Sequence, residues 1–97
     1  MPTYSWLTRF GAEFKALPAA QQAAFLAAVL KLVEDLRHGR GFRKGLRVKG
    51  VRGREGIFEM TWADDGRATF RYGASIVGTE PHIIWRRIGT HAILRQP

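Results

Sequence analysis

The chain of 97 residues is 45% hydrophobic, which suffices for one small domain with a core and excludes a disordered protein. It contains no cysteine, so disulfides, thiolate zinc sites and cysteine nucleophiles are excluded. Sixteen lysines and arginines against eight acidic residues give a net charge of +8, which favours a polyanionic partner such as RNA, DNA or an acidic protein. We expect a single domain over residues 1–97.

The N-terminal segment and the apolar runs bear on the location of the protein. Residues 1–7 lack the basic start and the following apolar stretch of a signal peptide. The longest apolar run, residues 23–30, is far shorter than the roughly 20 residues that a membrane-spanning helix needs. We therefore expect a cytoplasmic protein without membrane contact.

The first half of the chain is predicted to be mostly helical. Residues 4–7 form a weak strand candidate, and apolar residues at helical spacing predict a short helix over residues 10–17. A longer apolar stripe at the same spacing predicts a helix over residues 18–38. Gly39 suits the left-handed position that ends such a helix.

After residue 39 the apolar pattern changes from a period of 3.6 to a period of 2. Strands are predicted at residues 46–50, 56–63, 67–72 and 82–88, with a loop at 73–81. Helices followed by an antiparallel meander predict an α+β fold, with two N-terminal helices packed on one face of a small, mostly antiparallel sheet. We expect the other face of the sheet to be cationic and free of helices.

Two registers compete for the hairpin in the middle of this sheet. A two-residue turn at Asp65-Gly66 would mix charged and aromatic side chains on both faces. A three-residue loop over residues 64–66, with Gly66 left-handed, makes one face apolar and the other polar, so the pattern favours it. In this register Glu59 lies directly across from Arg71.

Half of the basic residues lie at positions 37–54, a segment that contains no acidic residue. Phosphate neutralisation would explain this concentration, because each cation that displaces a counterion strengthens binding to a nucleic acid. The alternative is a solvated loop in a protein that prefers arginine, since twelve of the sixteen basic residues are arginines.

Three further side chains are candidates for chemistry. His91 follows the last strand and can exchange a proton near neutral pH, although it is alternatively an ordinary surface histidine. Glu59 is either a general base or the partner that holds Arg71. Arg67 begins a strand beside the turn, where its guanidinium could clamp a phosphate or pair with an aspartate of the turn. Because the three histidines are scattered and cysteine is absent, no metal site is expected.

The order and spacing of four segments resemble the RelE/ParE toxin superfamily, especially its HigB-like and RelE-like members. The segments are Leu46-Arg-Val-Lys49-Gly50, Gly56-Ile-Phe-Glu59, Gly66-Arg67-Ala-Thr-Phe70 and Trp85-Arg-Arg87-Ile-Gly89-Thr-His91. The likeness runs from about residue 10 to residue 91. It implies a toxin encoded with an antitoxin and an RNA-cleaving site on the open face of the sheet. In the RelE branch the implied reaction is metal-free cleavage of mRNA in the ribosomal A site, by attack of the ribose 2′-hydroxyl on the adjacent phosphate.

The resemblance also implies roles for single residues. Arg67 matches the arginine on the strand after the hairpin turn, and His91 matches the arginine or histidine just past the last strand, a candidate acid. RelE has lysines where this chain has Glu59 and Thr61, so Glu59 is taken as the base. The catalytic candidates are Glu59, Arg67 and His91. RNA contacts are expected from five basic residues: Arg47, Lys49, Arg71, Arg86 and Arg87.

Three hypotheses for function follow. The first is a type II toxin that acts as a ribosome-dependent mRNA endonuclease (an mRNA interferase) by acid–base chemistry, without a cofactor or a metal ion. The second is a ParE-like inhibitor of DNA gyrase, which would act by protein contact. The third is a non-catalytic member of the fold that binds RNA or an antitoxin. A cognate antitoxin protein is the expected partner. We expect the chain to form either a homodimer or a toxin–antitoxin hetero-oligomer.

Overall fold

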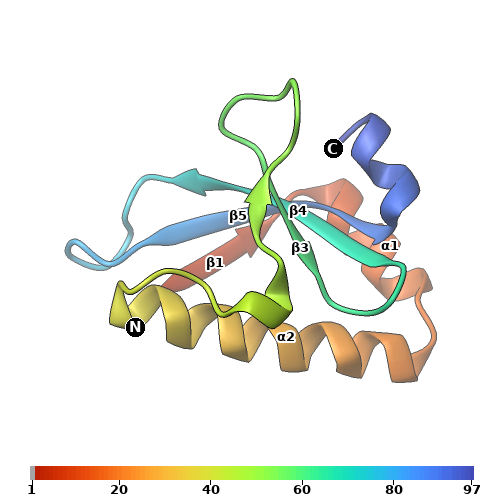
Figure 1. Ribbon diagram of the computed structural model, residues 1–97, viewed down its shortest axis with the longest axis horizontal. Coiled ribbons are helices and arrows are strands. Elements are labelled where there is room, and N and C mark those ends of the chain that lie inside the picture. Colours follow the sequence, from red (N-terminus) through yellow and green to blue (C-terminus); the bar gives the residue numbers. More distant parts are fainter. Residues whose placement is uncertain (1) are drawn as a thin grey trace.

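The computed structural model describes residues 2–97, and Figure 1 shows the order of its elements. The chain begins with strand β1 (Thr3–Trp6) and helices α1 (Thr8–Ala16) and α2 (Ala19–His38). Two 3₁₀ helices and four strands follow: η1 (Lys44–Leu46), β2 (Lys49–Gly50), β3 (Phe58–Thr61), β4 (Gly66–Gly73), β5 (His82–Thr90) and η2 (His91–Arg95). The two predicted helices are thus present, close to their predicted limits.

The strands form one sheet in the order β1-β5-β4-β3-β2. β1 pairs with β5 in parallel, and the other neighbours are antiparallel. Both long helices lie on the same side of the sheet, and α2 runs beneath it in Figure 1. The predicted α+β fold, with two N-terminal helices on one face of a mostly antiparallel sheet, is therefore confirmed. The parallel pairing of β1 is possible because α1, α2 and three strands separate it from β5 along the chain.

The core lies between α2 and the sheet. Phe25 and Leu32 of α2, Phe10 of α1 and Trp85 of β5 are all buried there. The ring centroids of Phe25 and Trp85 are 5.1 Å apart with their planes at 76°, an edge-to-face contact that adds to the burial of both rings. Gly39 ends α2 with the predicted left-handed backbone, at a φ of 67°.

The predicted strand at residues 46–50 is wrong in its first half. Leu46 ends η1, and its side chain is buried in the core. Arg47 then has a left-handed backbone with a φ of 48°, which cannot continue a strand. Strand pairing begins only at Lys49, across from Glu59.

The register of the hairpin between β3 and β4 differs from the predicted one. Glu59 pairs with Thr69 rather than with Arg71. The loop has three residues, but they are residues 63–65. The pairing is shifted by two positions along β4, so every side chain stays on its predicted face. The predicted faces are therefore right, and the predicted partner of Glu59 is wrong.

Aromatic packing accounts for this register. Phe58 and Phe70 lie opposite each other, with ring centroids 5.6 Å apart and planes only 21° from parallel. The indole of Trp62 covers Gly66 so closely that a Cβ there would lie 2.7 Å from its ring atoms. Residue 66 must therefore be glycine because of this close approach, and not because of a left-handed turn, since its φ is not positive.

The face of the sheet opposite the long helices is partly covered. η2 folds back over β4 and β5 on the side away from α2 (Figure 1), and its Ile93 is buried. On this face Thr69 is 0% exposed and Glu59 is 7% exposed. The expectation of an open, helix-free surface is thus wrong at the centre of the face. The accessible charged groups lie toward its margins.

Candidate functional site

His91 and Asp65 are held together at the hairpin end of the sheet. His91 begins η2 directly after β5, and its Nδ1 is hydrogen-bonded to the carboxylate of Asp65 in the β3–β4 loop. This hydrogen bond is the main cause that lowers the pKa of Asp65 below its ordinary value. The two side chains are 69% and 58% exposed. The imidazole is therefore held by a carboxylate and can still be reached from solvent.

No local sequence motif indicates the contact between Asp65 and His91. From the sequence, Asp65 is predicted to be a turn residue and, in one interpretation, a partner of Arg67. Its partner His91 is 26 positions away, and the two meet because Gly66 pairs with Thr90 across β4 and β5. Knowledge of the strand pairing, rather than of any local motif, is needed to find Asp65.

The side chain of Arg67 donates hydrogen bonds to backbone carbonyl groups of the same turn. Its guanidinium is held by carbonyl groups, and not by an aspartate side chain as the alternative interpretation expected. The positive charge of Arg67 also lowers the pKa of Asp65, as a smaller effect than the hydrogen bond from His91. The structure therefore brings Arg67 and His91 to one turn, around one carboxylate. Arg67 Nη1 donates to three carbonyl oxygens: Gly66 at 3.0 Å, Asp64 at 3.2 Å and Ala63 at 3.4 Å.

Two clefts flank this turn. One, of about 450 Å³, lies between α2, η1 and the β3–β4 loop, and the cations that line it are Lys31, Arg43, Arg47 and Arg67. The other, of about 310 Å³, lies between the loop, the end of β5 and the connection from α1 to α2. The turn that carries Asp65 thus projects between two hollows, and the larger of them is cationic.

Glu59 belongs to a different part of this face. Its Oε1 lies 3.9 Å from Nζ of Lys49. β3, which carries Glu59, lies two strand spacings, about 10 Å, from β5. The residue of β5 level with Glu59 is Arg87, and His91 lies four residues further along the chain. The structure therefore keeps Glu59 apart from His91, and pairs it with Lys49. The row across the sheet consists of Lys49, Glu59, Thr69 and Arg87.

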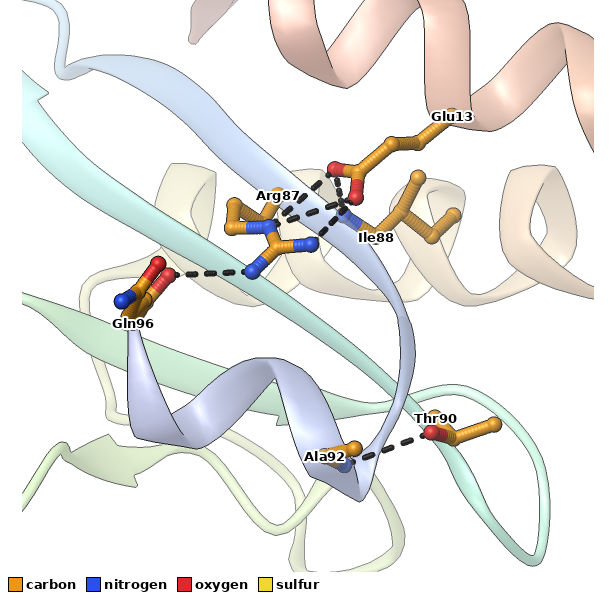
Figure 2. A network of polar contacts seen from close by, with 6 residues as sticks. All are labelled: Glu13, Arg87, Ile88, Thr90, Ala92 and Gln96. Atoms are coloured by element: carbon orange, nitrogen blue, oxygen red, sulfur yellow. Dashed lines mark hydrogen bonds and ion pairs between the residues drawn. The ribbon is translucent and has the colours of Figure 1, made fainter.

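Arg87 is held by a carboxylate from α1, as Figure 2 shows. Its Nη2 and Nε donate to Oε2 of Glu13 at 2.6 and 3.2 Å. Oε1 of Glu13 accepts the backbone N–H of Ile88 at 3.3 Å, and Nη1 of Arg87 donates to the carbonyl of Gln96 at 3.2 Å. Arg87 therefore ties α1 and the segment after η2 to β5, and its charge is already matched by Glu13.

The basic segment at residues 37–54 is only partly available to a ligand. The backbone N, Nε and Nη2 of Arg43 donate to the Asp35 carboxylate at 2.9, 3.0 and 2.9 Å. These contacts lower the pKa of Asp35, most of all through the side-chain hydrogen bond. Arg47 and Lys49, which were predicted to bind RNA, are exposed, whereas Arg71 and Arg86 are half-buried.

The remaining polar groups add no second acid–base centre beside the turn. His82 is buried, and its two ring nitrogens contact the hydroxyls of Thr3 at 2.7 Å and Ser5 at 3.2 Å, which joins β5 to β1. Over residues 2–97, no three histidine or acidic side chains gather closely enough to hold a metal ion. In the same part of the chain, none of the helices combines the length and the hydropathy needed to cross a membrane.

Comparison with solved structures identifies the fold. YafQ from Escherichia coli strain BL21(DE3) superposes with a TM-score of 0.63 at 14% sequence identity, over 97% of this chain and 98% of that chain. The YoeB/ParE toxin from Agrobacterium tumefaciens gives 0.64 at 11% identity, over 92% and 98%. A chain of the RelB-RelE antitoxin-toxin complex from Methanococcus jannaschii gives 0.60 at 13% identity, over 93% of each chain.

These matches show that the chain has the fold of the RelE/ParE toxin superfamily, as the sequence segments implied. The likeness extends over nearly the whole length of the chains compared. No protein-family model matches the sequence, and no curated protein matches it. The likeness is therefore one of fold and not of overall sequence similarity.

Proposed function

We propose that the chain is the toxin of a type II toxin–antitoxin pair and cleaves mRNA on the ribosome. The observation that carries the proposal is the Asp65–His91 pair beside Arg67, which joins an accessible acid–base group to a cation at one turn. The fold shared with toxins of the RelE/ParE superfamily supports it. The net charge of +8 favours a polyanionic substrate.

The chemistry follows from the groups present. The 2′-oxygen of a ribose attacks the adjacent phosphorus and passes its proton to water, and the bond from phosphorus to the 5′-oxygen breaks. Nη1 of Arg67 stays on the turn carbonyls, while Nε and Nη2 donate to the phosphate oxygens. His91 gives a proton from Nε2 to the departing 5′-oxygen. Asp65 fixes the orientation of the ring through Nδ1.

This reaction can be tested with purified protein and translating ribosomes loaded with a defined mRNA. We expect cuts inside the coding region that leave a 5′-hydroxyl on the downstream fragment. Intact mRNA together with inhibited DNA supercoiling by gyrase would support the ParE-like hypothesis instead. Salt-sensitive RNA binding without either activity would support the non-catalytic one.

Asp65→Asn is expected to lower the cleavage rate about tenfold or more, because the imidazole of His91 loses the carboxylate that orients it. The hydrogen bond from His91 lowers the pKa of Asp65 in the folded state. The stability that it contributes is therefore present above the ordinary carboxyl range and is lost as the pH falls through the lowered pKa. Cleavage rates at neutral pH, and thermal unfolding between neutral and acidic pH, measure the two effects.

Asp64→Asn is the matched control for this change, because Asp64 occupies the same loop and has no contact with His91 among the hydrogen bonds and ion pairs of residues 2–97. We expect it to cleave nearly as fast as wild type. Equal losses in the two variants would show that the loop charge matters and that the contact with His91 does not.

Glu59→Gln tests whether Glu59 acts as a base. Glu59 is buried and paired with Lys49, so we assign it to holding that lysine on the sheet. The substitution is expected to change the cleavage rate far less than the roughly 10²-fold that loss of a general base costs. A loss of that size in a variant that folds normally would return the base role to Glu59.

The proposal includes an antitoxin as the partner of the chain, in the cytoplasm where mRNA is translated. Three of the similar structures are toxin–antitoxin complexes, one with RelB and two with DinJ. A chain with a net charge of +8 would be neutralised best by a partner with an acidic segment. Co-expression with the product of an adjacent gene, followed by copurification and measurement of cleavage, tests this pairing.

A further inference from the structure

A second cationic pocket lies beside β5, away from the hairpin turn. It has a volume of about 420 Å³. Its charged lining comes from the start of α1, from the loop between β2 and β3, and from β5, and contains no acidic residue. The lining consists of four arginines, Arg9, Arg54, Arg86 and Arg87, with Leu7, Ile57, Gln96 and Pro97. Segments far apart in the sequence thus present guanidinium groups to one hollow.

Two of these arginines are held by a rigid backbone or by a direct contact. In the loop, Arg54 N donates to Val51 O at 3.1 Å, and Ile57 N donates to Arg54 O at 3.2 Å. Val51 N donates to Ile57 O at 2.8 Å and closes the loop, and the Val51 side chain is buried. In β5, Nε of Arg86 donates to the main-chain oxygen of Pro97 at 3.1 Å. The backbone that carries Arg54 and the guanidinium of Arg86 are therefore held in place before an anion binds.

The charge of the pocket is poorly compensated. Glu13 matches Arg87. Among residues 2–97, no carboxylate side chain forms an ion pair with Arg9 or Arg54, and Arg86 donates to the main-chain oxygen of Pro97. The guanidinium groups around this hollow repel one another, and an anion placed between them would relieve this repulsion.

The position of the pocket relates it to the hairpin turn. Arg87 lies on the same face as Arg67, because Arg67 pairs with Gly89, two residues further along β5. The distance along β5 from Arg87 to Thr90, just before His91, is about 10 Å. A few nucleotides of an extended RNA strand can reach from the pocket to the hairpin turn. Because an RNA strand carries one negative charge at each phosphate, it can place one phosphate in the pocket and another at Arg67.

We propose that the pocket formed by Arg9, Arg54, Arg86 and Arg87 binds a backbone phosphate of the RNA strand that is cut at Arg67 and His91. The identity of the strand rests on the proposed function. The guanidinium groups supply paired N–H donors that match phosphate oxygens, and Leu7 and Ile57 supply apolar walls beside the sugar. The pocket positions the RNA strand, and Arg67 and His91 at the hairpin turn carry out the cleavage.

The test compares two double variants of equal charge. Arg9→Gln with Arg54→Gln removes two exposed pocket arginines. Lys15→Gln with Arg52→Gln is the control, because these exposed residues come from the same helix and the same loop but do not line the pocket. Affinity is measured by fluorescence anisotropy, over a range of salt concentrations, for a short RNA with methylated 2′-oxygens. This RNA cannot be cleaved, so binding is read independently of activity.

We expect the pocket variant to bind the RNA about tenfold more weakly than the control variant, with a salt dependence reduced by about one counterion. Equal affinities and equal salt slopes in the two variants would overturn the pocket, whether or not wild type cleaves mRNA. An unchanged affinity for RNA with a weakened affinity for a polyglutamate peptide would also overturn it, in favour of an acidic protein segment. Weaker RNA binding by the pocket variant in a protein that never cleaves mRNA would support the pocket and refute the proposed function alone.

Discussion

Replacing His91 with alanine is expected to lower the rate of mRNA cleavage by roughly 10²- to 10⁴-fold, the range that loss of a general acid costs. The side chain is 69% exposed, and its hydrogen bond goes to Asp65, so the fold should survive its removal. Purified wild type and variant can be compared on ribosome-bound mRNA in single-turnover reactions, with thermal unfolding as the check on folding.

Two further variants make this result specific. His91→Gln can keep a hydrogen bond to Asp65 but cannot give up a proton near neutral pH, so we expect it to be as inactive as His91→Ala. His38→Ala removes an exposed histidine at the end of α2 and should leave the rate unchanged. Cleavage by His91→Ala at the wild-type rate would remove His91 from the mechanism.

Replacing Arg67 with alanine is expected to slow cleavage by about 10²- to 10³-fold, because the phosphate loses a preorganised cation as its charge is redistributed. Arg67→Lys keeps the charge but not the forked pair of donors, so its rate should lie between those of alanine and wild type. The rate constant for cleavage should fall more than the affinity for RNA, since other cations also contact the strand. Single-turnover rates at saturating enzyme, together with binding measurements, separate the two.

Arg67 also holds the carbonyls of the β3–β4 loop, so a structural effect of its loss must be distinguished. Arg71→Ala is the matched control, because Arg71 lies on the same strand and the same face, four residues from Arg67. It should lose RNA affinity at most. If Arg67→Ala cleaves as fast as Arg71→Ala, and both fold, then the cation at the turn has no catalytic role.

The helices and the faces of the sheet could be predicted from the sequence because each depends on local periodicity. The stripe over residues 18–38 and Gly39 correctly locate α2 and its end. Alternation correctly assigns Glu59 and Arg67 to the same face of the sheet, because Glu59 pairs with Thr69, two residues from Arg67. The parallel pairing of β1 and the cover provided by η2 depend on contacts between the two ends of the chain, which periodicity does not report.

The hairpin register could not be chosen by alternation. The predicted and observed registers differ by two positions, so both give the same apolar face. The choice depends on side-chain shape, through the packing of Trp62 on Gly66 and of Phe58 on Phe70.

In the candidate site, too, local features could be predicted from the sequence, and contacts between strands could not. Arg67 and His91 are candidates predicted from their chain positions and the family resemblance, whereas Asp65 becomes a candidate only once β4 is paired with β5. The predicted contact of Glu59 with Arg71 is wrong because it depended on the wrong register. The cation paired with Glu59 is Lys49. Contacts between strands depend on how many residues one strand is shifted along its neighbour. They were thus the least predictable part of the site.

The most direct measurement maps the 5′ ends of cellular mRNA after brief expression of the wild-type chain and of His91→Ala. We predict many new ends with a 5′-hydroxyl inside translated regions for wild type, and their absence for the variant. Full-length mRNA in cells whose growth the wild-type chain has stopped, or the same new ends with both proteins, would contradict it.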